Sequence, residues 1–424
     1  MRNREFFKNK KVTVIGLARS GSSCVNLLHE LGAEVSVSDA ARNPSTVENS
    51  LGIKSKEIKV ELGGHTPSFI KGRDLVVLSP GVAFDAPPVT WAKDYGIPLI
   101  GEIELSWILC PATIIAVTGS CGKTTVTTLL GRALEAAGKK AFVCGNIGKP
   151  FSQEVSKMQE GDFVCLEVSS FQLEAIQDFK PKAALILNIS PNHLDRYKNM
   201  QEYIDAKKRI FMNQDNSDFL VLNKEDPCVS KFAQETKARV LYFKSEKGLN
   251  PNQAAVISAV TALGIERAFA QEAFKNFTGI EHRLEFAGRV NNIKFINDSK
   301  ATTVDSCLWA LRNVSEPVVL IAGGKDKGVD YSAILAAAKG KIREVVLIGQ
   351  AREKIRQALK GSLPVQEAPT LEEAVKIAYR NSRPGDCVLL SPMCSSFDMF
   401  SNYEERGECF KRAVGELMRD TNDP

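Results

Sequence analysis

Short runs of β-branched and apolar residues alternate along the chain with longer stretches of helical periodicity. The apolar runs that predict strands are Lys11–Ile15, Glu34–Ser38, Leu75–Leu78, Ile114–Val117, Phe163–Glu167, Ala184–Asn188, Ile293–Asn297, Val318–Ala322, Glu344–Ile348 and Cys387–Ser391. Helices are predicted between or after these runs, for example at Thr125–Ala137, Gln253–Leu263 and Glu404–Met418. This alternation is typical of mainly parallel sheets covered by helices, so we predict an α/β fold.

Two interruptions of this pattern suggest domain boundaries. Cys110-Pro111 stands just before a new strand, and a glycine-bearing turn at 278–283 precedes another series of strands. A chain of 424 residues is too long for one ordinary core, since a domain usually takes about 100–200 residues. We predict three α/β domains: a Rossmann-like domain at 1–109, a central phosphate-loop domain at 110–280 and a second Rossmann-like domain at 281–424.

Composition and charge narrow the functional class. The chain is 44% apolar and 25% charged, as in soluble globular proteins. Its net charge of +5 suits acidic small molecules but is too mild to indicate nucleic acid. There is no run of about 18 apolar residues, so we expect neither a signal peptide nor membrane insertion. The ten cysteines form no CxxC pair and favour a reducing, cytoplasmic location.

The strongest chemical signal is the segment 114–125, which runs from a strand through the loop TGSCGKT into a helix. Glycines let backbone N–H groups turn toward phosphate oxygens, and the start of the helix adds its positive dipole end. Lys123 would then reach the β- and γ-phosphates, and Thr124 would bind Mg²⁺. Val117 replaces the first glycine of the full phosphate-loop pattern. The shorter motif TGxxGKT still predicts a binding site for a nucleoside triphosphate. The alternative is a glycine turn with a surface lysine.

Two further strand ends carry polar residues. Glu167 stands at the tip of an apolar strand, where a carboxylate could bind Mg²⁺. His193, one of only four histidines, follows the strand predicted at Ala184–Asn188. Each signal is weak alone, since a glutamate at a strand end is usually solvated and a lone histidine is more often structural.

The N-terminal unit imitates a dinucleotide fingerprint. Gly16 and Gly21 follow the first strand, and Asp39 ends the next one. Ala18, however, replaces the glycine that lets the backbone approach a pyrophosphate. The motif therefore favours a Rossmann-like sheet with a nucleotide other than NAD at its edge.

Taken together, the motifs resemble those of the Mur ligase family over the whole chain. Segments with the sequences TGSCGKTT, GNIG, LEVSSFQLE, NISPNHLDR, HR, NDSKAT and SPMCSSFD occur in the family's order. SSFQLE, DSKAT and SP-x-C-x-S are most similar to the branch that adds D-glutamate, and the DNPR-type signature of diaminopimelate-adding relatives is absent. The resemblance implies a cytoplasmic, monomeric, ADP-forming enzyme of peptidoglycan precursor synthesis. Such an enzyme joins D-glutamate to UDP-N-acetylmuramoyl-L-alanine through an acyl phosphate.

The resemblance also implies roles for individual residues. Its catalytic residues are Lys123, His193 and Lys207, with Lys207 as a carbamate. ATP contacts are expected at Gly119, Ser120, Cys121, Gly122, Lys123, Thr124, Thr125, Asn252, Arg283, Asp298 and Lys300. Two Mg²⁺ sites would use Thr124, Glu167, His193 and carbamoylated Lys207. The UDP-linked substrate would contact Leu17, Ala18, Ser38, Asp39, Ser79, Gly81, Val82, Asn146 and Ser169. D-Glutamate would contact Thr302, Lys327, Ser396, Phe397 and Tyr403.

This chain departs from the family pattern in several places. Cys121, Asn192, Thr303 and Tyr403 replace the usual asparagine, aspartate, asparagine and phenylalanine. The segment between Leu241 and Gln253 is much shorter than in relatives, and Gly248-Leu249 replaces a His-Asn pair. We therefore expect a small antiparallel sheet of the central domain to be missing, with consequences for adenine binding.

Three alternative functions remain open at this stage. A folylpolyglutamate synthase would share the architecture but need a folate-binding loop that the sequence does not show. An NAD-dependent dehydrogenase is disfavoured by Ala18 and by the separate phosphate loop. A degenerate ligase kept as a nucleotide-binding or scaffold protein would fit the shortened central segment.

Overall fold

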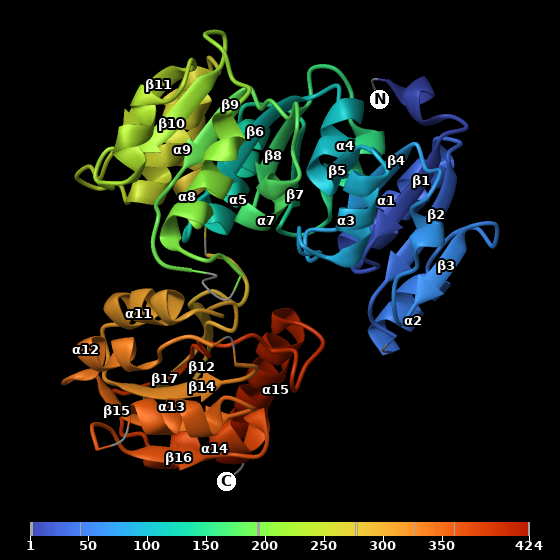
Figure 1. Cartoon of the computed structure of the whole chain (residues 1–424). Coiled ribbons are helices and arrows are strands. Elements are labelled where there is room, and N and C mark those ends of the chain that lie inside the picture. Colours follow the sequence, from blue (N-terminus) through green and yellow to red (C-terminus); the bar gives the residue numbers. More distant parts are fainter. Residues whose placement is uncertain are drawn as a thin grey trace. The chain divides into compact units, whose positions relative to one another are not determined.

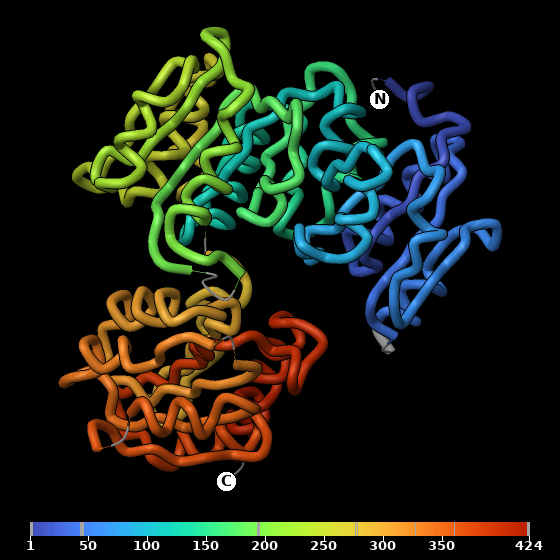
Figure 2. The backbone as a smooth tube through the Cα atoms, in the orientation of Figure 1, coloured from blue at the N-terminus to red at the C-terminus, as the bar shows by residue number. Residues whose placement is uncertain are grey.

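The structure of the protein is a computed structural model that describes residues 3–42, 44–192, 196–275, 277, 279–326, 328–359 and 361–422. Contacts divide the chain into two compact units. The first holds Met1–Ile189 and Met200–Phe277, and the second holds Ser190–Asn199 and Thr278–Pro424. Figures 1 and 2 show the elements of each unit in sequence colours. No helix among the described residues is long and apolar enough to cross a membrane.

The N-terminal part of the first unit is built on five parallel strands in the order β3-β2-β1-β4-β5. The strands are β1 (Lys11–Ile15), β2 (Glu34–Asp39), β3 (Lys59–Leu62), β4 (Leu75–Leu78) and β5 (Leu99–Gly101), and the helices are α1 (Arg19–Glu30), α2 (Pro44–Leu51), α3 (Pro87–Asp94) and α4 (Glu102–Leu109). Every residue of β4 is buried, as expected for a strand with helices on both faces.

A second sheet of the same unit has six parallel strands in the order β11-β10-β9-β6-β8-β7. The strands are β6 (Thr113–Thr118), β7 (Ala141–Gly145), β8 (Phe163–Glu167), β9 (Ala183–Ile186), β10 (Phe219–Asn223) and β11 (Arg239–Phe243), and the helices are α5 (Lys123–Ala136), α6 (Phe151–Glu154), α7 (Ser170–Glu174), α8 (Met200–Lys208), α9 (Pro251–Ala262) and α10 (Arg267–Lys275). β6 lies between β8 on one side and β9 on the other. A crevice at the carboxyl ends of such strands is where open α/β sheets bind ligands.

The second unit contains a six-stranded sheet in the order β12-β13-β17-β14-β15-β16, in which only β12 runs antiparallel to its neighbour. The strands are β12 (Glu285–Val290), β13 (Ile293–Asn297), β14 (Val318–Gly323), β15 (Ile342–Ile348), β16 (Val365–Glu367) and β17 (Cys387–Leu390). One face packs against α11 (Val304–Asn313), α12 (Leu335–Ala338) and α13 (Arg352–Leu359), and the other against α14 (Leu371–Asn381) and α15 (Tyr403–Asn422). Figure 1 shows these helices on both sides of the sheet.

Short 3₁₀ helices complete the secondary structure at Arg4–Phe7, Pro67–Phe69, Val155–Lys157, Arg209–Phe211, Val229–Gln234 and Ser332–Ile334. The predicted α/β class with mainly parallel sheets is confirmed. The sequence prediction of Ala184–Asn188 as a strand was too long, because β9 ends at Ile186 and Asn188 turns toward the phosphate loop.

The link between β11, the last strand of the central domain, and helix α9 is short. Residues 244–250 link β11 to α9, and within this described link only the pair Glu246 and Leu249 forms an isolated antiparallel bridge. Beyond that bridge, the described residues of this link form no strand.

Candidate active site

The phosphate loop lies between β6 and α5, where the sequence placed it. Gly119 and Gly122 have φ values of 152° and 85°, which other residues rarely adopt. A Cβ on Gly122 would lie 2.7 Å from Oδ1 of Asn252, so the Asn252 side chain would have to move if any other residue stood here. The same contact places Asn252, predicted to touch the nucleotide, directly beside the loop. The N-terminus of the 14-residue helix α5 follows at Lys123 and can contribute its N–H groups to phosphate binding.

Asn188 holds this loop in place, a role that the sequence did not reveal. The N–H of Cys121 donates to Asn188 Oδ1 at 2.8 Å, and Asn188 Nδ2 donates to the carbonyl of Cys121 at 3.0 Å. The N–H of Ser120 also donates to the backbone carbonyl of Asn188 at 3.0 Å. Three bonds from one residue therefore fix the middle of the loop. The sequence feature that could have indicated this role is the position of Asn188 just after a strand, at the start of the NISPN segment.

Replacing Asn188 by alanine is expected to loosen the phosphate loop without unfolding the protein. Loss of two hydrogen bonds should raise the KM for ATP about tenfold. Steady-state kinetics with varied ATP measure this effect. Asn223→Ala is the matched control, because Asn223 bonds the carbonyl of Leu187 at the next strand end and makes no recorded bond to the loop. Equal ATP constants in both variants would contradict the role of Asn188.

Lys123 lies at the first position of α5 with its ammonium turned onto the loop. Its Nζ donates to the carbonyls of Gly119 at 2.9 Å and Ser120 at 3.1 Å. These neutral acceptors can be exchanged for phosphate oxygens, which bind an ammonium more strongly because they are charged. Thr124 follows and is almost fully buried.

Glu167 ends β8, the strand beside β6, and meets Asn146 from the end of β7. Asn146 donates through Nδ2 to Glu167 Oε1 at 2.8 Å, and its N–H donates to the Glu167 carbonyl. The other carboxylate oxygen, Oε2, is buried and has no hydrogen-bond partner among the described residues. Buried carboxylate oxygens normally find a partner, and Mg²⁺ prefers such ligands. The Glu167 carboxylate therefore fits a Mg²⁺ ion.

Lys207 lies near the end of α8 and is buried. No carboxylate of the described residues forms a bond to its ammonium. Its side chain is 1% exposed, and Nζ donates to the Gly119 carbonyl at 3.0 Å and weakly to Thr118 Oγ1. Nζ also lies 4.7 Å from the centroid of the Tyr203 ring. Burial first, and the nearby positive charge of Lys123 second, hold the pKa of Lys207 well below its usual value. The residue reaches the phosphate loop and favours a neutral amine.

The remaining loop residues are placed as follows. Ser120 bonds Tyr203 Oη through its hydroxyl at 3.0 Å, and Ser169 caps α7 in a capping box with Gln172. His193 lies outside the described residues, so its catalytic and metal-binding roles stay predictions.

The predicted uridine pocket is organised around Asp39 at the end of β2. Its Oδ2 accepts the N–H of Leu17 at 2.6 Å and its Oδ1 accepts the N–H of Ala41 at 2.8 Å. Gly16, with φ of 90°, allows the turn that brings Leu17 there, and Ser79 donates its hydroxyl to the Gly16 carbonyl at 2.9 Å. Asp39 is thus committed to backbone groups of the Rossmann-like turn.

The other residues predicted for this substrate lie around the same strand ends. Ser38 bonds Glu61 and the ring of His65 through its hydroxyl. Ser79 and Val82 line a shallow depression together with Phe171 and Gln172 of α7. Ala18 caps α1, and Gly81 lies in the exposed turn before Val82. This depression is therefore lined by residues from both the N-terminal part and the central part of the unit.

In the second unit, the residues predicted to meet the nucleotide lie around Asp298. Its Oδ2 accepts the Ser391 hydroxyl at 2.9 Å, and Oδ1 accepts the N–H of Leu284 at 3.2 Å. Burial raises the pKa of Asp298 to about 7 despite these bonds and the positive charge of Arg283. His282 and Leu284 flank Arg283 with φ values of 61° and 43°, strained for residues with side chains.

Arg283 and Lys300 each rest on an aromatic ring. The guanidinium of Arg283 lies 5.5 Å from the centroid of Trp309, and the ammonium of Lys300 lies 5.2 Å from that of Tyr403. Trp309, on α11, is 40% exposed and was not predicted as part of the site.

The residues predicted for D-glutamate gather in loops of the same unit. Ser396 is buried, Phe397 is 66% exposed and Tyr403 begins α15. Thr302 lies directly before the N-cap residue of α11. Thr303 is the N-cap of α11, because its hydroxyl accepts the N–H of Ser306. Lys327 lies outside the described residues, and its contact with the substrate stays a prediction.

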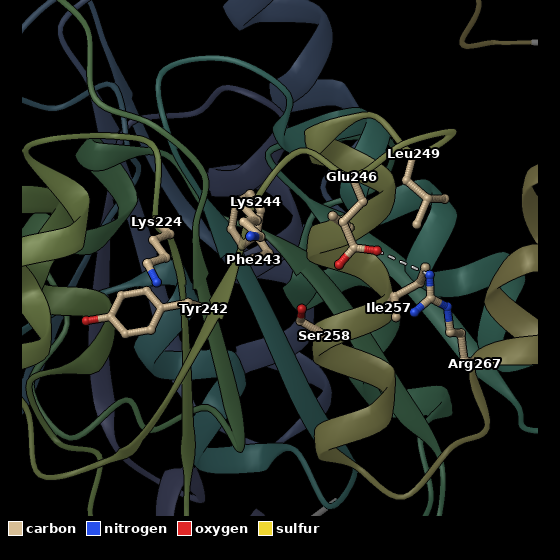
Figure 3. A pocket seen from close by; sticks show the side chains of 10 residues that line it. Lys224, Tyr242, Phe243, Lys244, Glu246, Leu249, Ile257, Ser258 and Arg267 are labelled. Atoms are coloured by element: carbon tan, nitrogen blue, oxygen red, sulfur yellow. Dashed lines mark hydrogen bonds and ion pairs between the residues drawn. The ribbon is translucent and has the colours of Figure 1, made fainter.

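A separate pocket of about 220 Å³ opens beside the ends of β10 and β11. Figure 3 shows Lys224, Tyr242 and Lys244 on one side, with Glu246 linked to Arg267 across the other. It is bordered by the shortened link between β11 and α9. None of the residues predicted to bind a substrate lines it.

The fold and site agree with comparisons to known proteins. Three family models match the chain: the Mur ligase MurD-like N-terminal domain at residues 10–101, the Mur ligase middle domain at 117–293 and the Mur ligase glutamate ligase domain at 282–394. Together they cover most of the sequence. The chain belongs to the Mur ligase family.

Two curated relatives to which the chain is similar are named UDP-N-acetylmuramoylalanine–D-glutamate ligase. The protein of Thermoanaerobacter pseudethanolicus is 42% identical over 451 positions, which cover 97% of this chain and 99% of the relative. That of Geotalea uraniireducens is 40% identical, covering 96% and 98% of the two chains. The first alignment is longer than the 424 residues of this chain, so this relative contains residues that the chain lacks.

Solved structures support the fold. UDP-N-acetylmuramate-alanine ligase from Thermotoga maritima aligns with a TM-score of 0.63 at 21% identity, covering 96% of this chain and 99% of the other. A pseudomurein peptide ligase type C from Methanothermus fervidus aligns with a TM-score of 0.57 at 18% identity, covering 96% and 100%.

Proposed function

We infer that this protein joins D-glutamate to UDP-N-acetylmuramoyl-L-alanine and converts ATP to ADP and phosphate. It is an amide ligase of peptidoglycan precursor synthesis, EC 6.3.2.9, as the names and coverage of its relatives support. The observation that carries the chemistry is the phosphate loop with the half-satisfied, buried Glu167 on the neighbouring strand. A dehydrogenase has no use for such a pair.

The division of labour follows the three predicted domains. The domain at 1–109 binds the UDP-linked substrate around Asp39, Ser79 and Val82. The domain at 110–280 binds ATP at the phosphate loop and Asn252. The domain at 281–424 contributes Arg283, Asp298 and Lys300 to the nucleotide and holds D-glutamate. The protein acts as a monomer in the cytoplasm.

Thr124 and Glu167 fit one Mg²⁺ ion, which would neutralise charge on the phosphates of ATP. Lys207 supports a second ion if its amine carries a carbamate. Burial lowers the pKa of Lys207 well below its usual value and so favours the neutral amine, which is the form that reacts with CO₂. The carbamate would place an anion beside Lys123 that can bind metal with His193.

The residues mainly bind and orient the reactants. The alanyl carboxylate of the substrate attacks the γ-phosphorus of ATP, the bond to ADP breaks, and an acyl phosphate forms. Lys123 and the loop N–H groups stabilise negative charge during this transfer. The amine of D-glutamate then attacks the acyl carbon, phosphate leaves with the former carboxylate oxygen, and the nitrogen loses its excess proton. No side-chain nucleophile is required.

The first test is the substrate dependence of ADP release. The proposal expects rapid release only when the UDP-linked substrate and D-glutamate are both present. If the rate of ATP hydrolysis does not depend on D-glutamate, the result instead supports a degenerate ligase that binds nucleotide.

Lys327 is expected to select the amino acid. Loss of one charged contact to a carboxylate costs about 2–3 kcal/mol, so Lys327→Ala should raise the KM for D-glutamate by roughly two orders of magnitude and that for ATP little. L-Lysine and diaminopimelate should be poor substrates. The control is Lys325→Ala in the same turn, whose side chain is exposed. An unchanged KM for D-glutamate in Lys327→Ala would remove this residue from the site.

A further inference from the structure

Arg406 is the largest fully buried side chain in the described part of the protein, and its exposed fraction is 0%. It lies in the first turns of α15, among the segments that carry the residues predicted to bind D-glutamate. Nε donates to the Ser299 hydroxyl at 3.0 Å, and Nη2 donates to the Ser299 carbonyl at 2.8 Å. Nη1 and Nη2 both donate to the Cys394 carbonyl at 3.2 Å. One guanidinium therefore joins the loop after β13 to the loop after β17.

A third loop closes against the same group. A Cβ built on Gly324 would lie 3.2 Å from Arg406 Nη1 and 2.3 Å from the Ser395 carbonyl, so only glycine fits beside the guanidinium. The next residue, Lys325, donates its N–H to that Ser395 carbonyl at 2.9 Å. The loop that leads to Lys327 is thus packed against the other two through Arg406.

The charge of Arg406 is not balanced by a bonded carboxylate. All its recorded hydrogen bonds go to neutral oxygens, and no described acidic side chain forms an ion pair with it. Asp398 is close enough to favour its charged form, but Asp398 Oδ2 accepts the N–H of Gln350. Burial lowers the pKa of Arg406 to about 10, which still leaves the side chain charged at neutral pH.

A buried charge without a directly bonded counter-charge is costly for folding, so it is rarely kept unless something compensates it. The planar fork of arginine explains the bonds to two loops, since lysine has no such geometry. It does not explain why no described carboxylate is bonded to the guanidinium. D-Glutamate has two carboxylates and, at neutral pH, a net negative charge.

We propose that Arg406 is a positioning residue of the amino-acid site, which clamps the three loops and supplies buried positive charge that favours an acidic amino acid. This inference rests on the proposed placement of D-glutamate in these loops. The guanidinium acts through the loops that it holds and through its field. It explains why the site prefers a dicarboxylate even where individual contacts are made by neutral groups such as Ser396.

The test uses the full-length enzyme with Arg406→Lys, which keeps the charge but loses the fork, and Arg406→Met, which loses both. The KM for D-glutamate should rise about tenfold in the lysine variant and about a hundredfold in the methionine variant. The KM values for ATP and for the UDP-linked substrate should change less than about threefold. Arg380→Met, an arginine on the exposed face of α14 paired with Glu373, is the control and should change none of the constants.

D-Glutamine separates the charge from the clamp, because it lacks the side-chain carboxylate. The preference of the enzyme for D-glutamate over D-glutamine should persist in Arg406→Lys and shrink about tenfold in Arg406→Met. A wild-type preference in the methionine variant, or equal losses for all three substrates, would overturn the proposal.

Folding is followed by thermal unfolding of each variant. If neither Arg406 variant folds, Ser299→Ala decides, because it removes only the hydroxyl that accepts from Nε. A threefold or larger rise in the D-glutamate KM supports the clamp, and an unchanged value overturns it. A wild-type enzyme that forms no product with D-glutamate would refute the proposed function itself, before any variant is compared.

Discussion

Lys123→Ala is expected to lower kcat by about 10³-fold or more while the protein stays folded. The ammonium sits at the start of α5, and its hydrogen bonds to other described residues go to loop carbonyls, so its removal costs few contacts of the fold. In phosphoryl transfer, however, it meets negative charge that develops on the transferred group. Steady-state kinetics measure kcat. Circular dichroism and thermal unfolding of the same sample show whether the variant is folded.

The control for this variant is Lys139→Ala. Lys139 follows the far end of α5 and is exposed, so its loss should leave kcat unchanged. Near-wild-type turnover by a folded Lys123→Ala variant would mean that the loop takes no part in the chemistry.

Lys207→Ala is expected to lower kcat roughly 10²-fold, and a small carboxylate such as acetate should restore part of the activity. The reason is that the carbamate supplies anionic oxygens, which added carboxylate can imitate in the space left by the side chain. Lys207→Arg should be as inactive as the alanine variant but without rescue, because a guanidinium forms no carbamate and fills the space. Turnover measured against acetate concentration distinguishes the three proteins.

Two further observations bear on Lys207. The neighbouring Lys208→Ala should keep its activity, since Lys208 pairs with Glu235 and not with the phosphate loop. Labelling with ¹³C-bicarbonate should give a carbamate signal in the wild type that is absent from Lys207→Ala. Full activity of Lys207→Ala, or the same signal in both proteins, would contradict the carbamate.

Much of the fold could be predicted because buried parallel strands leave a clear record in sequence. β4 and β17 are apolar at every position, and both were predicted. β3 and β16 were not predicted, because these edge strands are short and largely exposed and so lack an apolar run. β12 pairs antiparallel with exposed and buried residues mixed along it, which weakens its signal further.

The site was predictable where its chemistry requires a fixed local spacing. The phosphate loop needs glycines, lysine and threonine in order, and these are adjacent in the chain. Asn188 and Arg406 were missed because their importance depends on bonds to residues 67 and 107 positions away. A polar residue after a strand, or an arginine in an amphipathic helix, is ordinary in sequence. Only the folded structure shows that each one fixes a loop.

The most direct test follows the atoms of the reaction. The enzyme is incubated with ATP, Mg²⁺, D-glutamate and UDP-N-acetylmuramoyl-L-alanine labelled with ¹⁸O in the alanyl carboxylate, and the products are analysed by mass spectrometry. The account predicts the D-glutamyl amide, ADP, and phosphate that carries one ¹⁸O from the carboxylate. Absence of the amide, or amide formation accompanied by unlabelled phosphate, would contradict it.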